Sequence, residues 1–455
     1  MLDLALLAFV AMFLAFGLKR PFLWVLAYIY IDCVAPQKMG WGLIQAIPLS
    51  LIAFVAAFGG WLLFDNKEGT RFTLRQAIIA VLLAYCAYST TVADFPVAAL
   101  AKWDWVWKAL LFAIFLPLTL RTRLRFEATA LIMVLALATI VINGGVKTAM
   151  GGGGYGTLAL LVRENSGLYE GSILSTAAVS TIPLALWLAR HGTIFKPDWR
   201  VWTFVAGLIF ASLLIPVGTA ARTGLVCAAF LAVLMLRSAK RRFLYAALGG
   251  LALVLAVPFL PQSYLNRMST IENHSDDESA STRVAVWMWT WNYVKDHPYG
   301  GGFDAYRSNS FTYRMAKKTG TPPNETVTYE TVTDKARAYH SSYFEMLGEQ
   351  GWPGFILWLW LQLLGVWQME RIRWRFKRTE ESTRSWQWGL ATALQQAQLT
   401  YLLGAAFVGI AYQPYIYMLI GLQCGLWSYV KRTAGESPKA RFRRPQSDSS
   451  VPAHG

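Results

Sequence analysis

The stretch around His340 holds the residues best suited to catalysis. His340 opens an amphipathic segment in which Phe344 and Leu347 follow four and seven residues later, as on one face of a helix. The dipole at a helix N-terminus disfavours a charged imidazole, so we expect a neutral His340 that can accept a proton from an attacking hydroxyl. The alternative is a histidine that only hydrogen-bonds at an interface. Gly351 is a natural helix stop, and Pro353 then falls in the first turn of the next helix.

Arg222 is a candidate anion ligand. It is the only basic residue in the turn 218–224, which joins two apolar runs. Charge is costly at a membrane boundary, and a guanidinium there can bind phosphate through two hydrogen bonds while the small neighbours let a ligand approach. The alternative is an interfacial arginine that extends toward lipid headgroups.

Arg283 is the second candidate anion ligand. Acidic and Ser/Thr residues precede it, a long apolar and aromatic run follows, and Trp287 lies four residues further on. This pattern predicts a helix N-terminus with Arg283 in its first turn, where a cation opposes the helix dipole and an external anion would explain it. The alternative is an ion pair with one of the neighbouring carboxylates, which are Asp276, Asp277 and Glu278.

Other polar motifs are expected to be structural. The glycine-rich stretches 151–154 and 298–302 are taken as turns, and Glu345 and Glu349 as solvated or paired with loop arginines. The chain has no Asp-x-Asp pair, and its four cysteines show no Cys-x-x-Cys spacing. We therefore expect no metal, no other cofactor and no disulfide framework.

These candidate residues must be positioned by apolar helices. The 455-residue chain is 55% hydrophobic and only 15% charged, yet carries a net charge of +16. This combination fits nucleic-acid binding or a polytopic membrane protein with basic cytoplasmic loops. Apolar runs long enough for membrane helices recur near residues 3–18, 21–34, 43–64, 77–93, 105–120, 126–143, 172–189, 201–217, 222–236, 243–260, 352–369, 388–411 and 415–430.

The basic residues indicate the orientation of these helices. Every second break between apolar runs is rich in Lys and Arg, from Lys19 to the C-terminal tail, and the breaks between are poor in them. Such alternation places the basic breaks in the cytoplasm, so the positive charge reports topology and no nucleic-acid partner is expected. The N-terminal run lacks a basic region before it and is expected to be a retained membrane helix.

The fold predicted from this pattern is an all-α polytopic membrane protein with 12 or 13 transmembrane helices and one large extracytoplasmic loop. The predicted regions are N-terminal transmembrane helices (1–260), a large periplasmic loop with helices (261–351), C-terminal transmembrane helices (352–430) and a basic disordered cytoplasmic tail (431–455). A loop of this length inside a compact membrane protein is usually functional.

The motifs together resemble the O-antigen ligase family, also called the O-antigen ligase/polymerase superfamily. The resemblance rests on Arg222 in an Arg-Thr-Gly-Leu turn, Arg283 in Ser-Thr-Arg-x-x-x-Trp, the stretch 298–302, and His340 in His-Ser-x-Tyr-Phe-Glu. It covers roughly residues 170–430. The segment 276–283 also resembles a subgroup described as O-glycosylation ligases.

The resemblance implies a metal-independent, inverting glycosyltransferase of the GT-C class in the bacterial inner membrane. Such enzymes transfer a glycan from undecaprenyl diphosphate to a sugar hydroxyl of lipid A–core on the periplasmic side, in lipopolysaccharide biosynthesis. Arg222 and Arg283 would bind the diphosphate and His340 would be the general base. Sugar-stacking candidates are Tyr306, Tyr339 and Tyr343.

Two alternatives stay open at this point. A protein O-oligosaccharyltransferase or an O-antigen polymerase would use the same donor with a different acceptor. A non-enzymatic transporter of lipid-linked sugars would require charged residues buried within its helices for ion coupling. The sequence offers few candidates for these, mainly Lys108 and Glu127, both near predicted helix ends.

Overall fold

The computed structural model describes most of the chain. The described residues are 2–40, 42–67, 70–151, 158, 160–162, 167–237, 241–256, 278–319, 326–377 and 385–436. Several sequence expectations fall outside them, namely those for Asp276, for Asp277, for residues 152–154 and for the tail beyond Glu436.

The described chain is mostly helical, as the composition predicted. Each of the thirteen predicted apolar runs lies largely within one of its helices. The long helices are α1 (Leu2–Lys19), α2 (Phe22–Val34), α3 (Leu49–Phe64), α4 (Leu74–Thr91), α5 (Pro96–Thr119), α6 (Arg123–Ala149), α7 (Gly171–His191), α8 (Trp199–Gly218), α9 (Arg222–Leu236), α10 (Arg242–Ala256), α12 (Glu278–Asp296), α13 (Ser342–Lys377), α14 (Trp386–Ala405) and α15 (Pro414–Glu436).

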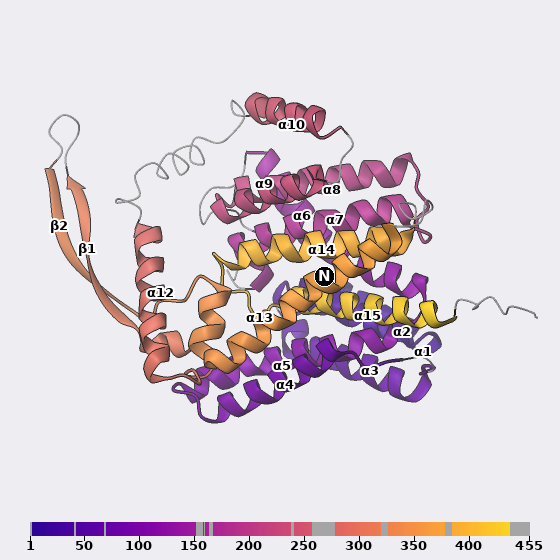
Figure 1. Cartoon of the computed structure of the whole chain (residues 1–455), viewed down its shortest axis with the longest axis horizontal. Helices are drawn as coiled ribbons and strands as arrows, with labels where there is room; N and C mark the ends of the chain where they lie inside the picture. The colour runs from indigo at the N-terminus through magenta and orange to yellow at the C-terminus, as the bar shows by residue number, and fades with distance from the viewer. Residues whose placement is uncertain are drawn as a thin grey trace, which may run out of the picture.

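Most of these helices lie side by side, with their axes close to horizontal in Figure 1. The N-terminal helices α1 to α5 form the lower part of that view, α6 to α9 the upper part, and α13 to α15 cross between them. Helix α14 packs on α7, and α15 packs on α5, so the C-terminal helices are the centre of the bundle. Helix α10 lies apart from the others, beside α9.

Three described helices, α6, α7 and α8, are long and apolar enough to cross a membrane. Helices α3 and α9 are apolar but shorter. Large apolar side chains are exposed on the outside of the bundle, as a lipid-facing surface requires; Phe210 is 62% exposed and Val233 63%. This architecture fits an all-α membrane protein, while the number of spans, 12 or 13, stays a prediction.

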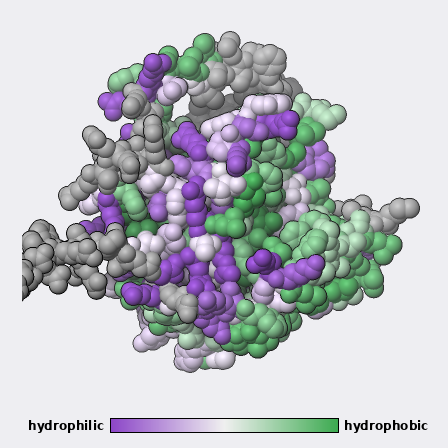
Figure 2. All heavy atoms as spheres, turned by 90° about the vertical axis from the view of Figure 1, so that its right-hand side faces the viewer, coloured by the Kyte–Doolittle hydropathy of each residue, from purple (hydrophilic) through white to green (hydrophobic). Residues whose placement is uncertain are grey.

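The basic breaks meet at one end of the bundle. Arg121 donates a hydrogen bond to the carbonyl of Asn66 (2.5 Å), Arg123 to that of His191 (2.7 Å), and Arg432 to that of Arg121 (2.7 Å). We call this the tail end, because α15 finishes there. Seen from this side, hydrophilic side chains gather in a band across the molecule (Figure 2).

The opposite end carries the segment between α10 and α13, and we call it the loop end. Its described part holds α12, the short helix η6 (Ala305–Ser308) and an antiparallel hairpin of β1 (Ser310–Thr319) and β2 (Thr326–Lys335), in which Ser310 pairs with Lys335. The hairpin projects from the bundle beside α12 (Figure 1). The sequence predicted a loop with helices here and did not predict this hairpin, in which strands rich in Thr, Val and Tyr pair.

Two further boundaries differ from the sequence expectations. Helix α15 continues to Glu436, so the predicted tail that starts at residue 431 begins as helix. Helix α12 begins at Glu278, which places Arg283 in its second turn and not its first.

Candidate functional site

His340 lies in a strained turn at the loop end, between β2 and α13. Its φ is +48°, in the left-handed region that non-glycine residues seldom occupy, and α13 begins two residues later at Ser342. Such strain persists where the surroundings hold a residue in place, and it is common at functional sites. His340 therefore precedes the helix that it was predicted to open.

Asn309 fixes the chain that leads to His340. Its side chain accepts a hydrogen bond from the backbone N–H of Arg337 (2.9 Å) and donates one to the carbonyl of the same residue (2.7 Å). The backbone N–H of Ala336 donates to the carbonyl of Asn309 (3.0 Å). Asn309 is 1% exposed, so these bonds are shielded from water.

Trp287 joins α12 to the same turn. Its indole N–H donates to the carbonyl of Tyr339 (2.9 Å), the residue just before His340. Its ring stacks on Phe344 in the first turn of α13, with the centroids 5.2 Å apart and the planes at 6°. Because Arg283 lies one helical turn before Trp287, the helix that carries this arginine is attached directly to the backbone beside His340.

Desolvation and the positive charges of Arg283 and Arg337 together lower the pKa of His340 to about 4, with desolvation the largest cause. The imidazole is therefore neutral at pH 7, as predicted from the sequence. The causes of the shift, desolvation and the charges of two arginines outside α13, were not predicted from the sequence. Arg337 also pairs with Asp334 at 2.6 Å, which holds its guanidinium on the β2 side of the turn.

Arg222 lies at the start of α9, where the tight turn predicted for residues 218–224 is present. Helix α8 ends at Gly218, Ala220 has a φ of +50°, and α9 begins at Arg222. Helix α9 packs on α14, where the thiol of Cys227 lies 3.6 Å from the carbonyl of Thr400.

Helix α14 also contacts the segment that follows His340. The hydroxyl of Tyr343 donates to the carbonyl of Leu402 (3.1 Å), two residues beyond the contact with α9. Arg283 and His340 thus come together through α12 and α13, and α9, which begins at Arg222, packs on the same helix α14 that Tyr343 contacts.

A buried ion cluster lies beneath this turn. The ammonium of Lys102 on α5 is 2.7 Å from Glu345, 2.8 Å from Glu349 and 3.8 Å from Asp304. Glu349 is fully buried and Glu345 is 7% exposed. The expectation that these two glutamates are solvated or pair with loop arginines was wrong. Only the tertiary fold brings Lys102 to them.

The cluster also binds the backbone around it. Glu349 accepts a hydrogen bond from the N–H of Asp304 (3.0 Å), and Glu345 accepts one from the N–H of Ala411 (3.0 Å). The Lys102 ammonium lies over the ring of Tyr412, 5.1 Å from its centroid. The attraction to Lys102 and these hydrogen bonds offset part of the cost of burying the carboxyl groups, and they join α5, η6 and α13 with the chain before α15.

The glycine-rich stretch 298–302 braces the kink in α13. Gly351 has a φ of +59° and interrupts the helix, as predicted from its place before Pro353. The N–H of Gly302 donates to the carbonyl of Glu349 (2.9 Å), and that of Trp352 donates to the carbonyl of Pro298 (2.9 Å). A Cβ on Gly351 would lie 2.3 Å from the carbonyl oxygen of Pro298, so this close approach requires glycine.

The three candidate tyrosines differ in access. Tyr339 is 3% exposed, and Tyr343 packs edge-on against Trp358 with centroids 5.3 Å apart. Tyr306 is half-buried, meets Tyr339 edge-on at 5.6 Å and lies beside Arg307. The hydroxyl of Tyr343 is bound to a helix carbonyl, and that of Tyr339 is enclosed in the core. Of the three, Tyr306 alone has neither restriction.

The described residues contain no group of three His, Cys, Asp or Glu side chains placed to hold a metal ion. The four cysteines are buried and unpaired. Glu127, one of the two candidates for ion coupling, accepts hydrogen bonds from the backbone N–H groups of Thr193 and Ile194 at the tail end, both at 2.5 Å.

Two family matches divide the chain. Residues 206–359 match the family described as O-Antigen ligase, and residues 1–193 match a family of unknown function, DUF5935. The first match contains Arg222, Arg283, His340 and the three candidate tyrosines, so the segment that carries the predicted site matches the family that its motifs resemble. The apolar helices together with this match fit a multi-pass membrane protein. No curated protein matches the chain.

Proposed function

We propose that this protein is a metal-independent, inverting O-antigen ligase that transfers a glycan from undecaprenyl diphosphate to a sugar hydroxyl of lipid A–core. The loop end would face the periplasm of the bacterial inner membrane, since the basic tail end fits the cytoplasmic side. The observation that carries the proposal is the attachment of Arg283 and His340 to each other through Trp287, within the matched segment.

His340 acts as the general base in this proposal. Its neutral imidazole takes the proton of the acceptor hydroxyl while the hydroxyl oxygen attacks the anomeric carbon of the donor sugar. The bond from that carbon to the diphosphate breaks with inversion, and undecaprenyl diphosphate leaves. Arg283 and Arg222 bind the charge that develops on the diphosphate, the role that a metal ion has in other transferases.

Donor binding would also activate the base. In the free protein, the charge of Arg283 helps to keep the pKa of His340 near 4, which makes the imidazole a weak base. A diphosphate bound to the arginine cancels that charge and adds negative charge nearby, so the pKa of His340 rises toward its ordinary value. The imidazole becomes a stronger base only when the donor is bound, so it activates an acceptor hydroxyl only when there is a glycan to transfer.

Reconstitution tests the proposal. The purified protein in proteoliposomes is given undecaprenyl-diphosphate glycan and lipid A–core, and the covalent product is measured. We expect His340→Ala to lower transfer by about 10²- to 10⁴-fold while donor binding is kept. Arg222→Ala and Arg283→Ala should weaken donor binding, and unchanged donor affinity in both variants would remove the diphosphate role.

Parallel arms identify the acceptor and the class of protein. A pilin-like protein and a second glycan repeat replace lipid A–core in separate reactions, because a protein O-oligosaccharyltransferase or an O-antigen polymerase would use them. Movement of the donor across the bilayer with no new glycosidic bond would instead indicate a transporter. A chelator should leave transfer intact; loss of activity that a divalent ion restores would contradict the metal-independent mechanism.

A further inference from the structure

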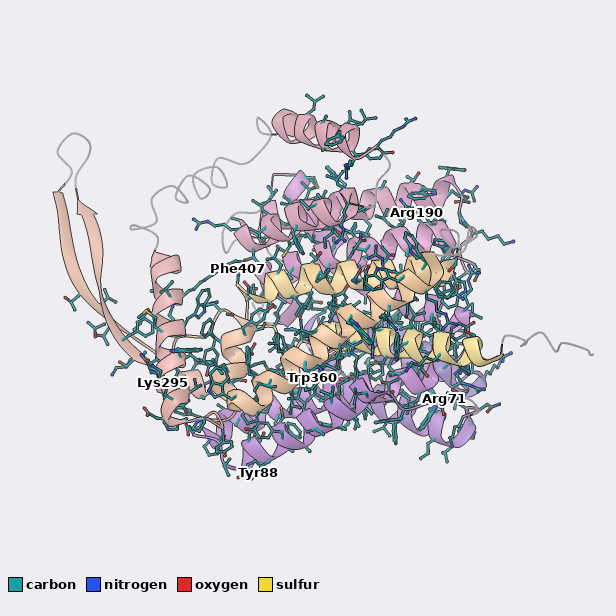
Figure 3. All side chains as sticks on the ribbon, in the orientation of Figure 1. Arg71, Tyr88, Arg190, Lys295, Trp360 and Phe407 are labelled. Carbon is teal, nitrogen blue, oxygen red and sulfur yellow. The ribbon has the colours of Figure 1, made fainter. Side chains whose placement is uncertain are left out.

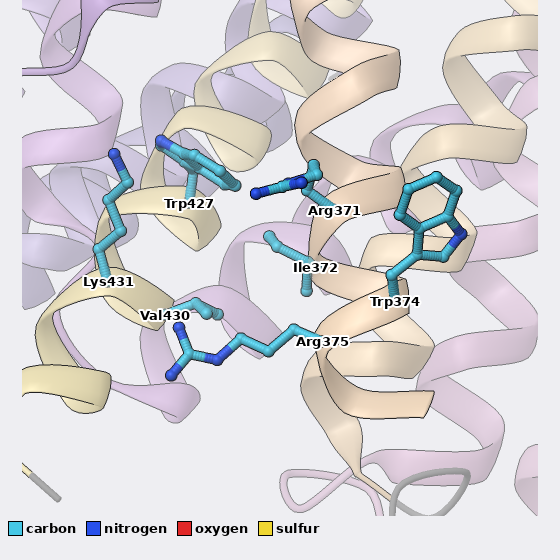
Figure 4. A pocket seen from close by; sticks show the side chains of 7 residues that line it. All are labelled: Arg371, Ile372, Trp374, Arg375, Trp427, Val430 and Lys431. Carbon is cyan, nitrogen blue, oxygen red and sulfur yellow. The ribbon is translucent and has the colours of Figure 1, made fainter. Parts of the chain in front are cut away.

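A cavity of about 670 Å³ opens at the tail end, between α13 and α15, far from the candidate site. Three cations line it, Arg371 and Arg375 from α13 and Lys431 from α15. Figure 4 shows both arginines reaching from α13 toward α15, where Trp427 lies beside Arg371.

These cations are not neutralised by carboxylates within the described part of the chain. Arg373, between the two arginines, pairs with Glu370, and it is absent from the cavity wall. Arg371 instead lies 5.5 Å from the ring centroid of Trp367, and Lys431 lies 4.7 Å from that of Trp427. Three unneutralised positive charges around one cavity favour an anion with several acceptor oxygens.

An exposed apolar stripe on α13 leads to this cavity. Its members recur at helical spacing along one face, and each is more than half exposed. They are Ile356 (52%), Trp360 (57%), Leu363 (58%), Trp367 (51%) and Trp374 (59%). Trp367 also packs on Trp427 of α15, with the ring centroids 6.0 Å apart, so the stripe ends at the cation-lined wall.

From this arrangement we infer that the cavity binds the phosphate headgroup of an anionic phospholipid, whose acyl chains lie along the stripe of α13. Guanidinium groups bind phosphate oxygens in pairs, and tryptophans are favoured where headgroups meet hydrocarbon. Basic pockets between membrane helices are suited to such headgroups. Free inorganic phosphate shares the anionic chemistry, but it leaves the apolar stripe unexplained.

The bound lipid would tie together two helices that have different roles. Helix α13 carries the candidate site at its loop end, and α15 packs against α5, which holds Lys102. A lipid bound to both α13 and α15 bridges their tail ends, where the described side chains facing the cavity would otherwise repel one another.

Native mass spectrometry of the whole protein from mixed phosphatidylglycerol and phosphatidylcholine nanodiscs tests this inference. We expect selective retention of phosphatidylglycerol by the natural protein. The variant Arg371→Gln/Arg375→Gln/Lys431→Gln should bind phosphatidylglycerol more weakly, by about fivefold for each cation removed and on the order of a hundredfold in total. The matched control Arg71→Gln/Arg190→Gln/Arg200→Gln removes the same charge from exposed positions on the same side and should retain the lipid.

Three results would overturn the inference. The first is equal loss of lipid in the cavity variant and the control variant, which would indicate a general surface effect. The second is no preference for phosphatidylglycerol over phosphatidylcholine. The third has two parts: millimolar inorganic phosphate displaces phosphatidylglycerol, and lipid binding is not lost when Trp360 and Trp367 are changed to Ser. Together these results would indicate a free-phosphate site.

Discussion

At the scale of single residues, the environment of His340 sets its chemistry. An imidazole held at a positive φ, flanked by Arg283 and Arg337 and partly desolvated, has its charged form disfavoured. The positive charges that hold it neutral include the proposed ligand of the donor diphosphate. Base strength and donor binding are therefore coupled through one arginine in the proposed mechanism.

The pH dependence of transfer tests this coupling. A His pKa that is lowered to about 4 keeps the neutral base present down to pH 5, so donor kcat/KM should stay flat from pH 7 to 5 and fall as pH drops through 4. The fall in kcat, which reports the pKa of His340 in the donor complex, should occur at higher pH than the fall in kcat/KM. Arg337→Gln removes a positive charge near His340, so it should move the fall in kcat/KM to higher pH. If kcat/KM falls near pH 6.5 and Arg337→Gln does not move that pH, His340 is not the base that titrates.

Trp287 provides a second test at this scale. Trp287→Phe keeps a ring against Phe344 but removes the hydrogen bond to the carbonyl before His340. We expect kcat to fall by about tenfold with donor KM little changed, because a misplaced base loses near-attack geometry. Trp291→Phe, one turn further along α12, is the control and should behave as the natural protein. A drop in stability without any change in kcat would assign Trp287 a structural role alone.

At the scale of elements, Lys102 holds several segments around the site. It connects α5 to the outer part of α13 through two buried carboxylates, and those carboxylates hold the backbone of Asp304 and Ala411. Below the cluster, glycines at residues 298–302 and Gly351 let the kinked helix pack closely on the preceding turn. The turn that carries His340 therefore rests on a rigid support.

Removal of Lys102 should be costly. Lys102→Met leaves two buried carboxylates without their cation, and we expect a loss of about 3–5 kcal/mol in stability. Adding Glu345→Gln and Glu349→Gln should restore much of it. Lys108→Met on the same helix is the control, because Lys108 pairs with the exposed Asp104 and should cost far less. Thermal unfolding in detergent measures each effect; equal midpoints for both lysine variants would show that the cluster is not structural.

At the scale of the whole molecule, the two ends of the bundle differ in charge. Arg71 and Arg190 lie toward the tail end, and Tyr88, Lys295 and Phe407 toward the loop end (Figure 3). The basic segments contact one another at the tail end, although they are far apart in the sequence. During membrane insertion, segments rich in Lys and Arg stay in the cytoplasm, so the tail end is expected on the cytoplasmic side.

Labelling with a membrane-impermeant maleimide tests this orientation. The four natural cysteines are buried and should react little, so introduced cysteines report alone. Ser308→Cys at the loop end should be labelled in intact spheroplasts, whereas Arg190→Cys at the tail end should be labelled only after the membrane is permeabilised. Both positions are exposed. The reverse pattern would place the candidate site in the cytoplasm and contradict the proposed donor access.

The sequence alone determined the parts of this protein that depend on neighbouring residues. Apolar runs predicted the helices, Gly351 before Pro353 predicted the kink, and the motifs around Arg222, Arg283 and His340 indicated the family that residues 206–359 match. These signals are local, because helix periodicity and turn chemistry involve residues a few positions apart.

The tertiary structure decided what depends on distant partners. Lys102 and Glu345 are 243 residues apart, so no spacing in the sequence could pair them, and the glutamates were assigned wrongly to solvent or to loop arginines. The pKa of His340 was predicted in the right direction, but the charges that lower it come from Arg283 and Arg337, which only the folded chain brings near the imidazole. Burial and long-range charge pairing arise only when helices pack, and both control the chemistry proposed here.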